Sequence, residues 1–115
     1  MDLEHLRDYC LKKRFVTEHT PFGPDTLVFK VHNKMFALCS IDNFTSVNLK
    51  CDPEIAQELR ANYIAVKPGY HMNKVHWNTV DVNQDVDDTH FLQLVDDSYM
   101  LVVQSLPKKL QATIL

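Results

Sequence analysis

The sequence predicts an α+β fold, in which an antiparallel β-meander forms a sheet and the helices pack on one of its faces. Three short runs rich in β-branched and aromatic residues follow one another closely, at residues 27–31, 35–41 and 46–50. Segments with apolar residues at helical spacing lie on both sides of these runs. The expected order of elements is therefore α-βββ-α-β-α.

The bulk properties indicate one ordinary globular domain over residues 1–115, with 45% hydrophobic and 23% charged residues. The N-terminus lacks the features of a signal peptide, and no apolar stretch is long enough to cross a membrane. We therefore expect a cytoplasmic monomer that needs no cofactor. The net charge of −3 comes mainly from the acidic residues after position 80, so the rest of the chain can carry a local basic face.

The first helix is expected over residues 2–13, because Leu3, Leu6 and Cys10 recur at helical spacing. Asp2 is a suitable N-cap, and basic residues follow at the other end, as the helix dipole favours. Two prolines and a glycine at residues 20–25 then predict a turn.

Two-residue turns at His32-Asn33 and Asp42-Asn43 are expected to join the three strands of the meander, since Asn and Asp tolerate the left-handed conformation. Turns of this length fix the strand register and so sort the side chains into two faces. The face that the helices should cover carries Leu27, Phe29, Phe36, Leu38, Val47 and Leu49. The face where a ligand could lie carries Val28, Lys30, Met35, Ala37, Cys39, Ser46, Asn48 and Lys50.

The second half of the chain supplies the remaining elements. Asp52-Pro53-Glu54 predicts the start of a helix whose inner side carries Ile55 and Leu59, with Ala56 as a further candidate. A strand is expected over residues 74–82, with Val75, Trp77 and Thr79 on one side. The last helix should start near Asp85 or Asp87 and end before Pro107, with apolar residues at helical spacing between them.

The segment at residues 68–78 combines polar and aromatic side chains more densely than any other part of the chain. Lys74 can contact a phosphate, Asn73 and His71 can hydrogen-bond a base or a sugar, and Tyr70 can stack on a base. The alternative is a loop that is packed by its own aromatic rings, with Trp77 in the core.

These segments resemble the MmcQ/YjbR family of small bacterial proteins. The resemblance rests on TPFGPD at residues 20–25, LVFKV at 27–31, KMFAL at 34–38, VNLKCDP at 47–53, PGYHMNKVHWNTV at 68–80 and SYMLVVQSLPKK at 98–109. It implies a fold similar to that of the frataxin-like CyaY proteins and a double-wing, DNA-binding arrangement in which hairpins act as wings. It implies no cofactor.

We therefore expect a DNA-binding module that uses lysines near the hairpins and the polar–aromatic segment. The candidate binding residues are Lys30, Lys34, Lys50, Tyr70, His71, Asn73, Lys74, His76 and Asn78. The alternative is a non-enzymatic adaptor that binds a protein partner or a small ligand over the exposed sheet face.

Catalytic and metal-binding interpretations are weaker, and we expect neither a catalytic nor a metal site. Cys39 or Cys51 could be a nucleophile with a histidine as base, but no motif for an oxyanion hole accompanies them. His71 and His76 lack further zinc ligands at a suitable spacing. The aspartates after residue 84 are expected to complement the N-terminus of the last helix or to face solvent.

Overall fold

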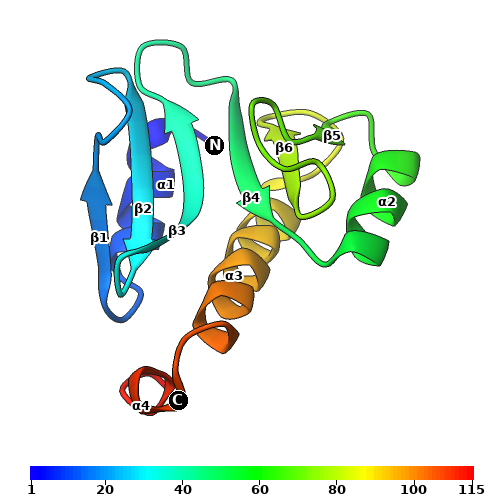
Figure 1. Cartoon of the computed structure of the whole chain (residues 1–115). Helices are drawn as coiled ribbons and strands as arrows, with labels where there is room; N and C mark the ends of the chain where they lie inside the picture. Colours follow the sequence, from blue (N-terminus) through cyan, green and yellow to red (C-terminus); the bar gives the residue numbers. More distant parts are fainter.

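The chain folds into a six-stranded antiparallel sheet with its helices on one side (Figure 1). The computed structural model describes residues 1–115. The strands, in the spatial order β1-β2-β3-β4-β6-β5, are β1 (Val16–His19), β2 (Thr26–Val31), β3 (Lys34–Ser40), β4 (Ser46–Lys50), β6 (Trp77–Asp81) and β5 (Val66–Pro68). The helices are α1 (Leu3–Leu11), α2 (Pro53–Asn62), α3 (Asp88–Gln104) and α4 (Lys108–Gln111). The predicted α+β class is confirmed.

Each of the three longer helices starts where an aspartate caps it. The side chain of Asp2 accepts a hydrogen bond from the backbone N–H of His5 at 2.8 Å. Asp52 caps α2, with Pro53 in the first turn, and Asp87 caps α3. These side chains satisfy backbone donors that the helix itself leaves unpaired, so the predicted helix starts are confirmed.

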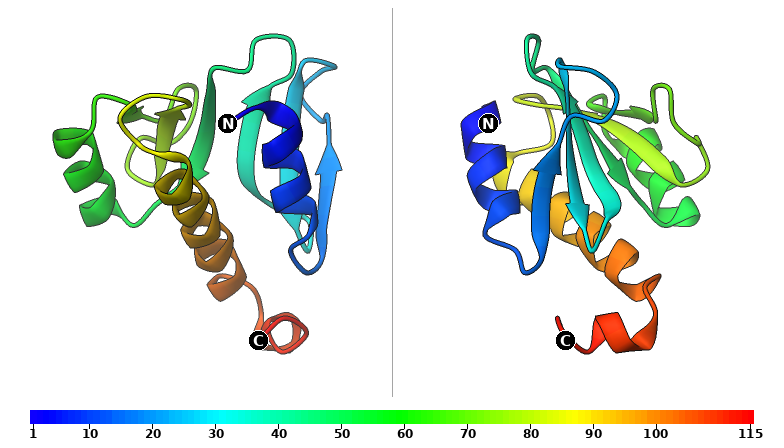
Figure 2. Two further views of the ribbon diagram at one scale, coloured as in Figure 1. Left: turned by 180° about the vertical axis from the view of Figure 1, so that it is seen from behind. Right: turned by 60° about the vertical axis from the view of Figure 1, so that its left-hand side comes forward.

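The helices cover one face of the sheet, and α1 and α3 lie in front of the strands when the molecule is seen from behind (Figure 2). The main core between them is apolar, and Phe29, Phe36 and Phe91 are among its largest fully buried side chains. Ser98 on α3 donates to the carbonyl of Phe36 at 2.6 Å and accepts from the N–H of Lys50 at 2.8 Å. This hydroxyl fixes α3 against the middle of the sheet.

The other face of the sheet, called the open face below, is not covered by any helix. Because side chains alternate along a strand, Thr26, Val28 and Lys30 of β2 point to this face.

No helix of the chain combines the length and the apolar character that crossing a membrane requires.

The structure contains elements that the sequence did not predict. These are the edge strands β1 and β5 and the short helix α4. The expected two-residue turn at His32-Asn33 is confirmed, with φ angles of 44° and 68°. The predicted two-residue turn at Asp42-Asn43 is wrong, because a longer loop, residues 41–45, joins the end of β3 at Ser40 to the start of β4 at Ser46. Asp25 holds this longer loop by accepting from the N–H of Asp42 at 2.8 Å.

The predicted register is wrong by one residue over most of the meander. Lys30 pairs with Met35 as expected, but Phe29 pairs with Ala37, which leaves Phe36 without a partner on β2. This is a β-bulge, which makes two consecutive residues of one strand face the same way. Phe36 and Ala37 accordingly both lie in the main core.

The bulge exchanges side chains between the two predicted faces. Leu38 was expected under the helices but packs on the open face against Val28 and Trp77. Ala37 and Cys39 were expected on the ligand face but belong to the main core. The remaining members of the predicted ligand face keep their places, because those on β2 and β4 lie in regular strands and Met35 precedes the bulge.

Smaller corrections concern the second half of the chain. Ile55 was expected on the inner side of α2 but is 50% exposed. Ala56, the further candidate, is buried, and Leu59 packs against the main core as expected. The strand that was expected from residue 74 begins at Trp77, so Val75 lies in the preceding loop and is exposed.

The burial of Phe36 gives a direct test of this packing. We expect the substitution Phe36→Ala to lower the free energy of unfolding by about 3–5 kcal/mol, because it leaves a cavity in a close-packed core. Phe22→Ala is the matched control, since Phe22 is 64% exposed, and it should change stability by less than about 0.5 kcal/mol. Urea denaturation followed by circular dichroism measures both, and equal costs would contradict the assigned packing.

Candidate functional site on the open sheet face

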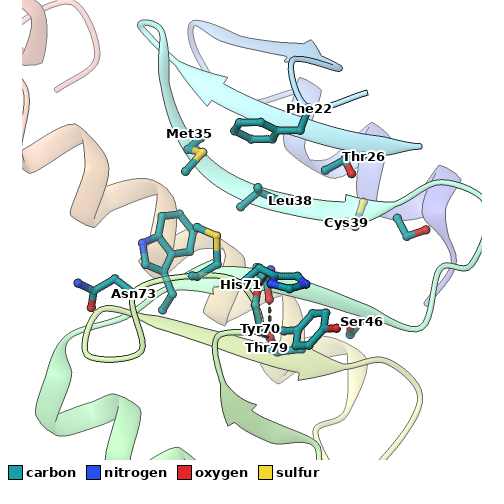
Figure 3. A pocket seen from close by; sticks show the side chains of 14 residues that line it. Phe22, Thr26, Met35, Leu38, Cys39, Ser46, Tyr70, His71, Asn73 and Thr79 are labelled. Carbon is teal, nitrogen blue, oxygen red and sulfur yellow. Dashed lines mark hydrogen bonds between the residues drawn. The ribbon is translucent and has the colours of Figure 1, made fainter. Parts of the chain in front are cut away.

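A pocket of about 790 Å³ lies on the open face, between loop 20–25 and loop 69–76 (Figure 3). It is lined by Phe22, Thr26, Met35, Leu38, Cys39, Ser40, Ser46, Asn48, Tyr70, His71, Met72, Asn73, Trp77 and Thr79. Its size is in the range of pockets that hold small molecules.

The bottom of the pocket is a small apolar cluster, separate from the main core. It consists of the buried side chains of Val28, Leu38 and Trp77, with Met35 and Met72 packed against them. Methionine side chains adapt their shape to a neighbour, and an indole offers a broad flat surface. The bottom of the pocket is therefore suited to a planar apolar group.

Exposed aromatic rings stand at the sides of the pocket. Phe22 projects from loop 20–25, and Tyr70 and His71 project from the opposite loop (Figure 3). Tyr70 is 68% exposed, and its ring centroid lies 4.0 Å from that of His71. His71 has a φ angle of 58°, a conformation that is uncommon for a residue with a side chain and often occurs at functional sites.

A chain of hydrogen bonds holds loop 69–76 over the sheet. The hydroxyl of Thr79 on β6 donates to Asn48 Oδ1 at 2.5 Å and accepts from the N–H of Tyr70 at 2.9 Å. Asn48 Nδ2 donates to the carbonyl of Tyr70 at 3.3 Å. These polar side chains therefore position the aromatic ring of Tyr70 beside the pocket.

Gly69 allows the loop to approach β6 closely. Its N–H donates to the carbonyl of Trp77 at 2.9 Å, and a Cβ atom at this position would lie 2.8 Å from Trp77 Cβ. Any larger residue would push the loop away from the strand. Lys74 Nζ closes the loop by donating to the carbonyl of Gly69 at 3.0 Å.

The pocket itself carries no lysine, arginine, aspartate or glutamate. Lysines stand next to it on the same face, because Lys30 pairs with Met35 and Lys50 pairs with Trp77. Neither lysine takes part in an ion pair. The opposite end of the open face carries Asp81, which forms an ion pair with Lys67 at 2.6 Å.

The structure brings together only part of the predicted site. Tyr70, His71 and Asn73 line the pocket, and Lys30 and Lys50 lie beside it on the open face. Lys34 lies next to the His32-Asn33 turn, and Lys74 and His76 are exposed in loop 69–76. These latter three do not line the pocket.

Asn78 requires a correction. It is 1% exposed and points away from the open face, where its Oδ1 accepts from Arg60 Nε at 2.7 Å. The alternation of side chains along β6 places it opposite to Trp77 and Thr79. Asn78 is therefore a buried polar anchor and not a ligand contact.

The sequence did not predict that Phe22, Leu38 and Trp77 line the pocket or that Arg60 supports it. Phe22 and Leu38 belong to segments that carry the family resemblance, but nothing in their spacing indicated a pocket. Only the alternation of Trp77 with Thr79 gave a usable signal, because it placed both on one side of their strand.

The cysteine thiols are held in their protonated form. Burial raises the pKa of Cys10 to about 12, that of Cys39 to about 12 and that of Cys51 to about 11. The position of Cys51 next to the start of α2 therefore does not activate it. No three side chains of His, Cys, Asp or Glu lie close enough to share a metal ion.

The raised pKa of Cys51 predicts how its alkylation depends on pH. Only the thiolate reacts, so the rate should rise about tenfold per pH unit between about pH 7 and about pH 9, without a plateau. Labelling with iodoacetamide and peptide mass mapping measures this rate. Cys51→Ser is the control and should react far more slowly, because the remaining thiols are buried. A plateau at about pH 8.5, the value of a free cysteine, would contradict the prediction.

Comparisons with known proteins place this geometry in a family. The chain is 37% identical over 107 residues to the uncharacterized protein YbdF of Escherichia coli O157:H7, covering 92% of this chain and 88% of that protein. It is 33% identical over 110 residues to the uncharacterized protein YjbR of Escherichia coli K12, covering 95% and 93%.

Solved structures of similar sequence have the same fold. The crystal structure of the Deinococcus radiodurans protein DR2400, a DUF419 domain, matches with a TM-score of 0.89 and 35% identity, covering 97% of this chain and 86% of that one. A crystal structure from Pseudomonas syringae matches with a TM-score of 0.75 and 30% identity, covering 88% and 98%. The YjbR family model matches residues 11–101. The chain therefore belongs to the YjbR family.

Proposed function

We propose that this domain binds single-stranded DNA, with unpaired bases in the open-face pocket and phosphates along Lys30 and Lys50. The observation that carries the proposal is the combination of an aromatic pocket that contains no lysine, arginine, aspartate or glutamate with two lysines, free of ion pairs, on the same sheet face. Proteins that bind single strands commonly combine stacking rings with a basic track for the backbone.

The pocket has the properties that a nucleobase requires. A base is planar and uncharged, so it gains from contact with Trp77, Met35 and Leu38 and needs no counter-charge. Phe22 and Tyr70 are exposed rings that lose unfavourable contact with water when a base stacks on them. The volume of about 790 Å³ has room for more than one base.

In this proposal the two lysines contact the backbone next to those bases. Lys30 and Lys50 border Met35 and Trp77, which line the pocket. At the other end of the face, Lys67 is already paired with Asp81, so its charge is not free for a phosphate. The free cations of the face therefore favour a path of the strand across the end that carries Lys30 and Lys50.

The topology favours a single strand over a duplex. The connections at residues 32–33 and 41–45 lie at opposite ends of β3, as Figure 1 shows. For a strand of this length the two ends are about 20 Å apart, so these connections do not form adjacent wings. A base in a duplex is stacked and paired, and it cannot enter a pocket without being flipped out.

A second candidate is a small, uncharged, planar molecule that binds in the same pocket. It is favoured by one observation, which is that none of the lining residues is a lysine, arginine, aspartate or glutamate. Such a ligand would use the apolar cluster and the aromatic rings but not the lysines. Its affinity would therefore not depend on salt, which distinguishes it from DNA.

A fluorescence-anisotropy titration with a labelled oligothymidine tests the proposal. The wild-type protein should bind at low salt, and Lys30→Ala and Lys50→Ala should each flatten the log–log salt dependence by about 0.7. Tyr70→Ala should weaken binding by about 1–3 kcal/mol without changing that slope, because stacking involves no counter-ions.

Lys12→Ala is the matched control, since Lys12 is exposed, takes part in no ion pair and follows α1 on the far side of the sheet. It should bind like the wild type. A wild-type protein that does not bind the oligonucleotide at low salt contradicts the DNA proposal. If it then binds a neutral aromatic dye with an affinity that salt does not change, the second candidate takes its place.

A further inference from the structure

We propose that Arg60 is the positioning residue of the pocket, holding loop 69–76 in its binding form from behind the sheet. Arg60 lies in the last turn of α2 and is not one of the residues that line the pocket, but it binds the backbone of one of them, Trp77. The inference about the loop stands on the structure alone, and its effect on ligand affinity rests on the proposed function.

The guanidinium group binds two backbone carbonyls, one in the middle of the loop and one at the start of β6. Arg60 Nη2 donates to the carbonyl of Lys74 and, at 3.2 Å, to the carbonyl of Trp77. The carbonyl of Trp77 also accepts from the N–H of Gly69, at 2.9 Å. One cation therefore binds the middle of the loop at Lys74 and the carbonyl of Trp77, which also holds the first residue of the loop.

Asn78 orients this cation. Its Oδ1 accepts from Arg60 Nε at 2.7 Å, and its Nδ2 donates to the carbonyl of Ala56 at 3.5 Å. Because Asn78 is 1% exposed, water cannot easily replace either bond. The bond from Nε to Asn78 thus fixes the orientation of the planar guanidinium, and Nη2 then points at the carbonyls of the loop. A lysine ammonium cannot make both sets of bonds in this geometry.

The backbone that Arg60 holds carries the binding side chains. Trp77, whose carbonyl it contacts, forms the bottom of the pocket. Tyr70 follows Gly69, which depends on the same carbonyl for its own hydrogen bond. Without the guanidinium, the carbonyls of Lys74 and Trp77 lose a charged hydrogen-bond donor. Because loops held by few bonds open locally, loop 69–76 should then open more often.

The chain offers an internal probe for this effect. Trp77 is its only tryptophan, so the intrinsic fluorescence reports on the bottom of the pocket. We expect Arg60→Gln to shift the emission to the red and to raise the acrylamide quenching constant, while the protein remains folded. Affinity for the oligothymidine should fall about tenfold, as expected when a charged hydrogen-bond donor is removed.

Arg7→Gln is the matched control. Arg7 donates to both carboxylate oxygens of Glu18, at 2.6 and 2.5 Å, and so ties α1 to β1 on the far side of the sheet. Its loss should leave the fluorescence, the quenching and the affinity at wild-type values. Arg60→Lys retains the charge but not the fork, and it is expected to lie between wild type and Arg60→Gln in quenching. This variant also serves if Arg60→Gln does not fold.

The results separate the two proposals. Unchanged quenching of Trp77 in both Arg60 variants overturns the positioning role. Increased quenching in a protein that never binds the oligonucleotide supports the positioning role and overturns the DNA proposal. Increased quenching with unchanged oligonucleotide affinity overturns the link between the loop and the ligand.

Discussion

The β-bulge at Phe36 is the feature on which the rest of this structure depends. It lets Phe36 and Ala37 both enter the main core under the helices. From that point the alternation of β3 is inverted, so that Leu38 faces the other side and meets Val28 and Trp77. The sheet therefore has one apolar core on each side. The smaller core is not covered by a helix and forms the bottom of the pocket.

The two sides of the sheet are stabilised by different means. The covered side is apolar, and the hydroxyl of Ser98 ties α3 to the sheet at its centre. The open side has only the small apolar cluster of Val28, Leu38 and Trp77. Loop 69–76 is also held by hydrogen bonds from Thr79 and Asn48 on the open face and from Arg60 behind it. The pocket is shaped in advance because its loop is bonded from both directions.

The candidate site could be predicted only in part. Tyr70, His71 and Asn73 were found because they stand together in one polar–aromatic segment. Arg60 carried no comparable signal, because a basic residue in the last turn of a helix is explained by the helix dipole. Its partners are the side chain of Asn78 and two backbone carbonyls, and carbonyls are the same in every sequence.

The sequence by itself determined the fold class, the aspartate caps of the three long helices and the first hairpin, because these depend on neighbouring residues. Only the tertiary structure decided the register. Two strands can pair in registers that differ by one residue with almost the same local energy, and the choice falls to the packing of large side chains against distant helices. Here the burial of Phe36 beneath α3 made that choice, and it placed the pocket where it is.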